Sequence, residues 1–399
     1  MVVVVIHQGS AFRFPRADLA GEPFASHLPG QLLAKAKGGI VVIDTINPFA
    51  GQPDSVDARL VAGQDLLLVA ADAWFSAAAL EKLCLLISAN PDKASVVRIG
   101  DHEAGGGNLP QTLLAVYLPA AEAGPLLAQH GLQVFNESLA ESGRRLGNCR
   151  IIDGKSLDPI LPPVQVRNLL DLAMLERGVL FERACAALLS GIRIRDPNRV
   201  AIRGELHCGS GVEIDVDVII EGKVTLGDGT RIGASSILIN STIGANTRVN
   251  PFSIVEDAVI GSNSFVGPYG RVRPGSKIGD SAQIGNFVEI KNSEIGSGSR
   301  INHLAFIGDA TLGKNVTIGA GSITCNHDGV GVSRTEIESG AYVGSGCELV
   351  APLSIGTNAT IGAGSTITQD VPARKLTLAR SRQVTVENWV RPDTKPADK

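Results

Sequence analysis

The C-terminal half of the chain carries an aliphatic residue at almost every sixth position, and this spacing limits the fold more than any other feature. The repeated positions include Ile214, Ile220, Leu226, Ile232, Leu238, Ile243, Val249, Ile260, Val266, Val272, Ile278, Ile284, Ile290, Ile295, Ile301, Ile307, Ile355, Ile361 and Ile367. Such hexads are the signature of a β-helix, in which three hexads form one triangular coil and the aliphatic side chains stack inside it. Residues from about Val200 to Thr368 are therefore predicted to form a left-handed parallel β-helix.

The amino-acid composition suits a chain with many tight turns around aliphatic side chains. Among 399 residues there are 46 glycines, whereas aromatic residues make up only 4%. The net charge of −4 and the lack of a basic block argue against nucleic acid as a partner. The sequence lacks an apolar stretch of about 18 residues, so no membrane insertion is expected. We expect a cytoplasmic protein whose six scattered cysteines are free thiols.

The first part of the sequence, residues 1–165, alternates apolar runs with a stretch of helical pattern. The predicted strands are Val2–Ile6, Ile40–Asp44, Leu66–Ala70 and Leu113–Tyr117, and a predicted amphipathic helix spans Ala77–Ala89. Such alternation is typical of an α/β domain built on a sheet. This domain is expected to end at the proline-rich segment Pro159–Pro163.

A linker helix is predicted within residues 166–191, between the first domain and the β-helix. Its apolar positions recur at helical spacing, at Leu169, Leu172, Leu175, Val179 and Leu180. Gly191 is a suitable residue for the position just after a helix. Residues 192–399 then form the β-helix domain and its C-terminal tail.

Four polar side chains depart from the aliphatic and small residues of the hexads, namely Arg273, Lys291, His303 and Asn326. Asn326 lies in a segment, 325–335, that interrupts the hexads, and insertions in solenoids often carry function. Two cations suit a phosphate group. A histidine suits the removal of a proton from an amine, because its ordinary pKa lies near neutrality. A lone surface histidine is more often merely solvated, but this grouping favours a site for amine acylation.

Several longer motifs in the same region are more specific than the hexads. They are Arg193–Pro197, Val218–Gly222, Arg273–Gly275, Gly285–Glu289, Ile318–Gly321, Ile323–Asn326, Leu349–Pro352 and Trp389. Through these motifs the chain, from about Val166 onward, resembles the GlmU family of bifunctional N-acetylglucosamine-1-phosphate uridylyltransferases and glucosamine-1-phosphate N-acetyltransferases. The resemblance implies an enzyme that uses acetyl-CoA, needs no metal for acetyl transfer, and forms a homotrimer with active sites between subunits.

The resemblance also implies a role for each matching residue. His303 would be the general base, and Glu289 would orient it. The amino sugar phosphate would be bound by Arg273, Lys291, Asn326, Phe306 and Thr317. The acetyl-CoA site would be lined by Ala320, Ser345, Ala363 and Arg380, where backbone N–H groups can stabilise an oxyanion.

Four positions depart from the family pattern on the acceptor side. Phe306 replaces a tyrosine, Thr317 an asparagine, His327 a tyrosine and Val332 a lysine. Each lost hydrogen-bonding partner weakens phosphate recognition by about 1–3 kcal/mol. Glucosamine-1-phosphate is the first candidate for the acceptor, whereas a different amino sugar and a non-catalytic trimeric scaffold are the alternatives.

The first domain departs further from the family. Its segment from Val5 to Arg13 holds a single glycine, Gly9, where the family has a glycine-rich phosphate-binding loop. Asp72 matches a magnesium-binding aspartate, but Arg167 replaces the second ligand, and a cation there opposes metal binding. We expect a shortened, degenerate nucleotidyltransferase-like fold without uridylyltransferase activity.

Overall fold

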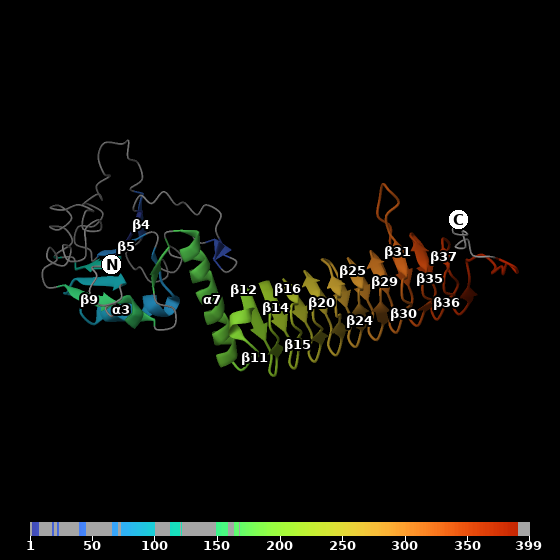
Figure 1. Cartoon of the computed structure of the whole chain (residues 1–399), viewed down its shortest axis with the longest axis horizontal. Helices are drawn as coiled ribbons and strands as arrows, with labels where there is room; N and C mark the ends of the chain where they lie inside the picture. The colour runs from blue at the N-terminus through green and yellow to red at the C-terminus, as the bar shows by residue number, and fades with distance from the viewer. Residues whose placement is uncertain are drawn as a thin grey trace, which may run out of the picture. The chain divides into compact units, whose positions relative to one another are not determined.

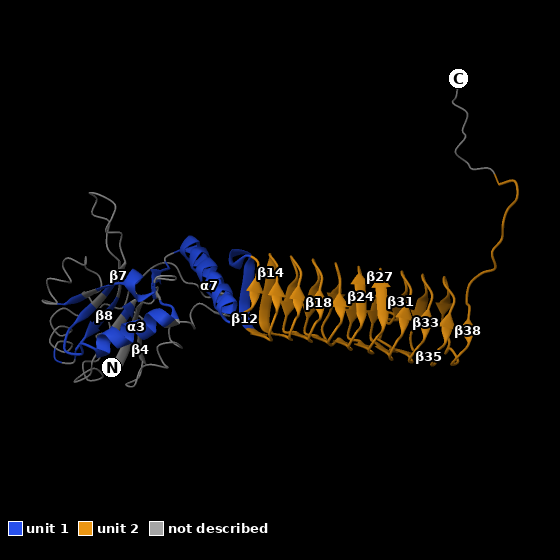
Figure 2. Cartoon of the chain, turned by 90° about the horizontal axis from the view of Figure 1, so that it is seen from below, with its two compact units in different colours: residues 1–190, 196–205 blue, residues 191–195, 206–399 orange. Residues whose placement is uncertain are grey.

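The computed structural model describes residues 2–7, 18–19, 22–23, 40–44, 66–70, 73–99, 112–119, 121, 149–158, 163–166 and 168–389. The chain divides into two compact units (Figure 2), the first made of Met1–Ser190 and Asp196–Glu205 and the second of Gly191–Arg195 and Leu206–Lys399. The positions on which the degenerate nucleotide site was predicted, Gly9, Asp72 and Arg167, lie outside the described residues. That site therefore stays a prediction.

A mixed sheet organises the first unit (Figure 1). Its strands lie in the order β4 (Ile40–Asp44), β1 (Val2–His7), β5 (Leu66–Ala70), β8 (Thr112–Leu118), β7 (Ser95–Ile99) and β9 (Arg150–Asp153). β1 runs parallel to β4 and β5, whereas β8 is antiparallel to β5 and β7. The shorter elements are β2 (Asp18–Leu19), β3 (Glu22–Pro23), β6 (Ala73–Trp74), β10 (Val164–Gln165), α3 (Ala77–Ser88) and α6 (Gly154–Leu157). The α/β class, the four predicted strands and the predicted helix are confirmed.

Helix α7 (Leu169–Leu189) occupies the predicted linker segment. It ends just before Gly191, whose φ of 96° suits the position that follows a helix. Three of the five predicted apolar positions are buried, whereas Leu169 is 64% exposed. The helix is confirmed, and its buried face begins one turn later than the apolar pattern suggests.

The second unit is a parallel β-helix with three strands in each regular coil (Figure 2). Its first face is a sheet of β11 (Arg193–Ile194), β13 (Glu213–Ile214), β15 (Arg231–Ile232), β18 (Arg248–Val249), β21 (Phe265–Val266), β24 (Gln283–Asn286), β27 (Arg300–His303), β30 (Thr317–Ile318), β33 (Tyr342–Val343), β36 (Thr360–Ile361) and β38 (Leu376–Thr377). The 17-stranded sheet forms the other two faces, because β14 (Val218–Leu226) is long enough to pair on both. It starts at β12 (Val200–Cys208), which follows the 3₁₀ helix η2 (Pro197–Arg199).

The remaining strands of the 17-stranded sheet alternate between the second and third faces. The second face continues with β16 (Ile237–Ile239), β19 (Ile254–Glu256), β22 (Arg271–Val272), β25 (Glu289–Lys291), β28 (Phe306–Gly308), β31 (Ile323–Cys325), β34 (Glu348–Val350) and β37 (Thr366–Ile367). The third continues with β17 (Thr242–Ile243), β20 (Val259–Ile260), β23 (Lys277–Ile278), β26 (Glu294–Ile295), β29 (Ala310–Leu312), β32 (Thr335–Ile337) and β35 (Leu353–Ile355).

The strand register places the aliphatic residues of the hexads on top of one another. On the first face Ile232 pairs with Val249, and Val249 pairs with Val266. Stacked positions of this kind are sealed from solvent, and Ile290 and Ile307 on the second face are 0% exposed. The predicted left-handed parallel β-helix is thereby confirmed, with its core made of aliphatic rungs.

At one corner of the β-helix, between the first and second faces, the residues change from bulky side chains to glycine along the length of the helix. Its successive residues are Phe252, Tyr269, Phe287, Leu304, Gly321, Gly346 and Gly364. The rings of Phe252 and Tyr269 stack at 5.0 Å, and those of Tyr269 and Phe287 at 5.1 Å. A Cβ added at Gly346 or Gly364 would meet nothing within 4 Å. Bulky side chains therefore cover the earlier coils, and the later coils present bare backbone.

Shortening one rung should destabilise the β-helix. The substitution Ile307→Ala is expected to lower its free energy of unfolding by about 2–5 kcal/mol, because it removes buried methylenes and leaves a cavity. The substitution Val259→Ala is the matched control, since that side chain is 49% exposed on the third face. Urea denaturation of both variants measures the difference, and equal losses would show that Ile307 does not support the core.

Burial also controls a thiol at the start of the β-helix. It raises the pKa of Cys208 from 9.0 to about 11. Since the reactive form is the thiolate, at pH 8 alkylation by iodoacetamide should be about 100-fold slower at Cys208 in the folded protein than in the denatured chain. Peptide mass spectrometry after timed quenching measures both rates. Equal rates would show that the folded environment leaves this thiol unchanged.

Candidate active site

The predicted base, His303, lies at the end of β27, where the chain turns from the first face toward the second. The register pairs it with Asn286 on the preceding strand, and its Nδ1 lies 2.5 Å from Asn286 Oδ1. Because a carbonyl oxygen accepts, this contact assigns a proton to Nδ1, and in the neutral imidazole the lone pair is then on Nε2. The imidazole is exposed, so this lone pair is open to an incoming group.

Glu289, the predicted orienting residue, is occupied elsewhere. Its Oε1 accepts a hydrogen bond from Arg273 Nη1 at 2.7 Å, and both side chains are about one-third exposed. In this chain Asn286 therefore holds the imidazole, while Glu289 holds Arg273. Sequence reasoning missed Asn286. The signal that could have identified it is its position one coil before His303 in the repeat.

A buried carboxylate, Asp309, brings together two predicted substrate residues. Asn326 Nδ2 donates to its Oδ2 at 2.5 Å, and Lys291 Nζ lies 3.8 Å from the same oxygen. Asn292 Nδ2 donates to Oδ1 at 2.6 Å. The Asp309 side chain is only 7% exposed, so these donors supply the partners that a buried charge requires. Sequence reasoning missed Asp309 because a corner aspartate is ordinary in this fold.

The aromatic ring of Phe306 lies beside this cluster. A Cβ added at Gly308 would lie 2.6 Å from Phe306 Cζ and 3.0 Å from Asn326 Nδ2. Gly308 also pairs with Lys291 on the neighbouring strand. Because Gly308 has no side chain, there is room beside it for the ring of Phe306, the amide of Asn326 and the neighbouring Lys291.

The predicted acetyl-CoA residues continue the column that starts at His303. The register of β27, β30, β33 and β36 carries this column through Ala320, Ser345 and Ala363. The backbone N–H of Gly346 donates to the Ala320 carbonyl oxygen at 2.8 Å, and Arg380 Nη1 donates to that of Ala363 at 2.9 Å. Small side chains here border the bare corner, so an elongated ligand has space beside them.

Two of the predicted acceptor-side positions stand apart from these contacts. Thr317 lies on the first face, paired with Arg300 and Tyr342. Val332 is 56% exposed in the insertion, where it forms an isolated bridge with His327. Within the described residues, neither side chain has a recorded contact with the Asp309 cluster or with His303.

The insertion is ordered by its own side chains. Asp328 Oδ1 accepts hydrogen bonds from the backbone N–H groups of Gly331 and Val330, and these bonds lower the pKa of Asp328.

Burial, and then the carboxylate of Glu348, raise the pKa of the Cys325 thiol. Cys325 is thus a poor nucleophile beside Asn326, and the imidazole is the more suitable reactive group.

Within the described residues, no group of histidine, cysteine and carboxylate side chains has the arrangement of a metal site. No helix in the described part of the chain is long and apolar enough to cross a membrane. Cys185, Cys208, Cys325 and Cys347 are free thiols, as the spacing of the cysteines predicts.

Fold and site together define the second unit as a β-helix protein of the hexapeptide-repeat class. Residues 334–369 match the family model for the hexapeptide repeat of succinyl-transferase. The bifunctional protein GlmU of Herminiimonas arsenicoxydans is 52% identical over 227 residues, which cover 57% of this chain and 50% of that relative. GlmU of Methylobacillus flagellatus is 52% identical over 223 residues, 56% of this chain and 49% of the relative. Over this segment the chain is similar to GlmU proteins, and it spans about half the length of the curated relatives it matches.

Solved structures give a looser likeness. The UDP-N-acetylglucosamine acyltransferase from Campylobacter jejuni matches with 18% identity and a TM-score of 0.28, over 47% of this chain and 69% of that one. The polySia-specific acetyltransferase NeuO matches with 18% identity and a TM-score of 0.22, over 51% and 90%.

Proposed function

We propose that this protein is an acetyl-CoA-dependent N-acetyltransferase that acylates the amine of an amino sugar phosphate. The observation that carries the proposal is the His303 imidazole, which Asn286 holds through Nδ1 so that Nε2 is open for a proton. Glucosamine-1-phosphate is the first candidate for the acceptor, because the motifs that resemble the GlmU family surround this site. Uridylyl transfer is not part of the proposed function.

The chemistry follows from the free Nε2. The amine nitrogen attacks the thioester carbonyl carbon of acetyl-CoA, and Nε2 takes the proton that the nitrogen loses. The carbon–sulfur bond then breaks, and the CoA thiolate leaves and regains a proton. Arg273 and Lys291 would face the acceptor phosphate, although each already has a carboxylate partner, Glu289 and Asp309. These ion pairs reduce the positive charge that is available to the phosphate, so we expect a modest phosphate affinity. The acceptor would then be selected by its shape as well as by its charge.

The acetyl-CoA side of the proposal rests on the bare corner. Beyond Leu304 its positions are Gly321, Gly346 and Gly364, so an extended pantetheine chain could lie along exposed backbone beside Ser345. Arg380, which is exposed and bonded to the Ala363 carbonyl oxygen, would meet the phosphates of CoA.

A homotrimer in the cytoplasm, with active sites between subunits, is the proposed setting. His303 is exposed and Leu304 is 61% exposed beside it, so the single chain leaves one side of the site open. Light scattering coupled to size-exclusion chromatography tests the assembly, and a monomer at micromolar concentration would contradict it.

One assay distinguishes the candidate functions. Purified full-length protein receives acetyl-CoA and a panel of amino sugars with and without a 1-phosphate, and free CoA thiol is followed over time. Release with glucosamine-1-phosphate supports the first candidate, and release with another amino sugar alone supports an altered acceptor. The absence of release with every acceptor would favour a non-catalytic scaffold. Pyrophosphate release from UTP, N-acetylglucosamine-1-phosphate and magnesium should be absent.

The substitution Phe306→Tyr should improve phosphate recognition. A hydroxyl beyond Cζ would stand beside Asn326, so the KM for glucosamine-1-phosphate should fall by about 2- to 10-fold with kcat unchanged, the range for one added hydrogen bond. Glucosamine without phosphate is the matched control acceptor, and its KM should not change. Equal shifts for both acceptors would show that the hydroxyl does not act on the phosphate.

A further inference from the structure

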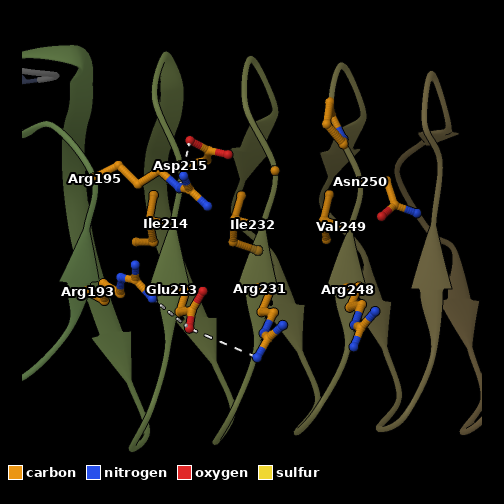
Figure 3. Close-up of a pocket in the computed structure, with 12 residues that line it drawn as sticks. Arg193, Arg195, Glu213, Ile214, Asp215, Arg231, Ile232, Arg248, Val249 and Asn250 are labelled. Carbon is orange, nitrogen blue, oxygen red and sulfur yellow. Dashed lines mark hydrogen bonds and ion pairs between the residues drawn. The ribbon is translucent and has the colours of Figure 1, made fainter.

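A cationic pocket lies on the first face of the β-helix, in its earliest coils (Figure 3). It has a volume of about 210 Å³, and all of its lining residues belong to the second unit. It lies on β11, β13, β15 and β18, and two strands of the same sheet, β21 and β24, separate β18 from β27, which carries His303. The pocket is therefore separate from the candidate active site.

Two columns of side chains form the pocket. The register aligns Arg193, Glu213, Arg231 and Arg248 in one column, and the row of buried aliphatic residues follows it along the strands (Figure 3). Two residues further along each strand, a second column contains Arg195, Asp215, Gly233 and Asn250. Gly233 contributes no side chain, and the place of its missing Cβ is taken by Pro251, whose backbone N would lie 2.6 Å from such a Cβ.

Positive charge in this pocket exceeds negative charge, since four arginines face two carboxylates. Arg195 pairs with Asp215 at 3.3 Å, and Arg193 pairs with Glu213 at 3.4 Å. Arg231 reaches the already engaged Glu213 only at 4.0 Å. Arg248 has no carboxylate within ion-pair distance among the described residues. The surplus charge is thus concentrated on Arg231 and Arg248.

These two arginines occupy paired positions on neighbouring parallel strands, whose backbones lie about 4.8 Å apart. Like charges carried on neighbouring positions in this way repel each other unless an anion lies between them. A guanidinium presents a planar fork of donors that matches phosphate oxygens, and a dianion can accept from two such forks at once. The pocket is smaller than the roughly 300–1,000 Å³ of typical drug-sized sites, so it suits a compact group.

We propose that this pocket binds a phosphate or diphosphate group, held in the space between Arg231 and Arg248. The amide of Asn250 borders the same space, and its Nδ2 already donates to the Gly267 carbonyl oxygen at 3.0 Å. The proposal does not depend on acetyl transfer, because it uses none of the residues assigned to that reaction.

Calorimetric titration of the full-length protein tests the proposal. Inorganic phosphate and pyrophosphate are the probes, with sodium chloride at matched ionic strength as the reference. Arg248→Gln should weaken binding by about tenfold or more, the loss typical of a hydrogen-bonded charge. Arg300→Gln is the matched control, because Arg300 lies in the same column on β27, outside the pocket, and should bind as the wild type does.

A second variant, Arg231→Gln, repeats the test, and circular dichroism of each variant reports its folding. Tighter binding of pyrophosphate than of phosphate would assign a diphosphate, and the reverse would assign a single phosphate. Binding that stays unchanged in both pocket variants would place the anion elsewhere and overturn the proposal. Heat no greater than that of the chloride reference would overturn it as well.

Discussion

Alanine at position 303 is expected to reduce kcat for acetyl transfer by about 10²- to 10⁴-fold, because the amine then loses the group that takes its proton. The fold should be unaffected, since the imidazole is exposed and its recorded side-chain partner is Asn286. Thiol release at saturating substrate measures kcat, and calorimetry should give an unchanged affinity for acetyl-CoA. A His303→Ala variant with the wild-type rate would refute the proposed base.

The partner of the base provides a control with a smaller effect. Asn286→Ala leaves the imidazole in place but removes its orientation, so a loss of about tenfold is expected. Added imidazole should partly restore activity to His303→Ala, because it can occupy the vacated space and accept the proton. It should restore little activity to Asn286→Ala, because the His303 ring is still present in that variant and occupies the same space. Equal rescue of both variants would contradict the assigned roles.

The second large effect is expected for Asp309→Asn. Asparagine tolerates the left-handed backbone of this position, where φ is 50°, so the change removes charge rather than shape. The amide keeps one acceptor oxygen where the carboxylate has two, so it cannot serve Lys291, Asn326 and Asn292 together, and kcat/KM for the amino sugar phosphate should fall by about 10- to 100-fold. Steady-state kinetics with the acceptor varied measures this loss.

Asp280→Asn serves as the comparison for Asp309→Asn. Asp280 is also a coil-end aspartate, and its Oδ1 accepts from the backbone N–H of Ser262 at 2.7 Å, but it is exposed and lies at a different corner, between β23 and β24. Its replacement should leave kcat/KM unchanged. A similar fall in both variants would mean that aspartates at coil ends stabilise the β-helix generally, and Asp309 would then have no special part in the site.

The repeat made much of the architecture predictable. A hexad pattern specifies both which side chains point inward and how many residues separate neighbouring strands, so the stacking of Ile232 on Val249 follows from spacing alone. The same counting places Asn286 beside His303, one coil earlier. The local pattern was also sufficient to predict α7, because apolar residues at helical spacing define the helix and the following Gly191 defines its end.

Contacts that depend on side-chain direction were beyond the pattern. Nothing in the spacing distinguishes Asp309, which gathers Lys291 and Asn326, from the exposed aspartates at other coil ends. Glu289 was assigned to the imidazole through the family resemblance, yet in the structure its carboxylate pairs with the guanidinium of Arg273. The arginine pocket also went unnoticed, because its columns emerge only when strands from successive coils are aligned.

The insertion after Cys325 has a further consequence for how such a protein can change. Ile318 pairs with Val343, 25 positions later, yet Val343 pairs with Ile361 only 18 positions on, so the regular repeat resumes at once. The extra residues leave the coil and return to it without displacing the aliphatic stack. The length and sequence of this loop, next to Asn326, can therefore change in evolution while the β-helix keeps its stability.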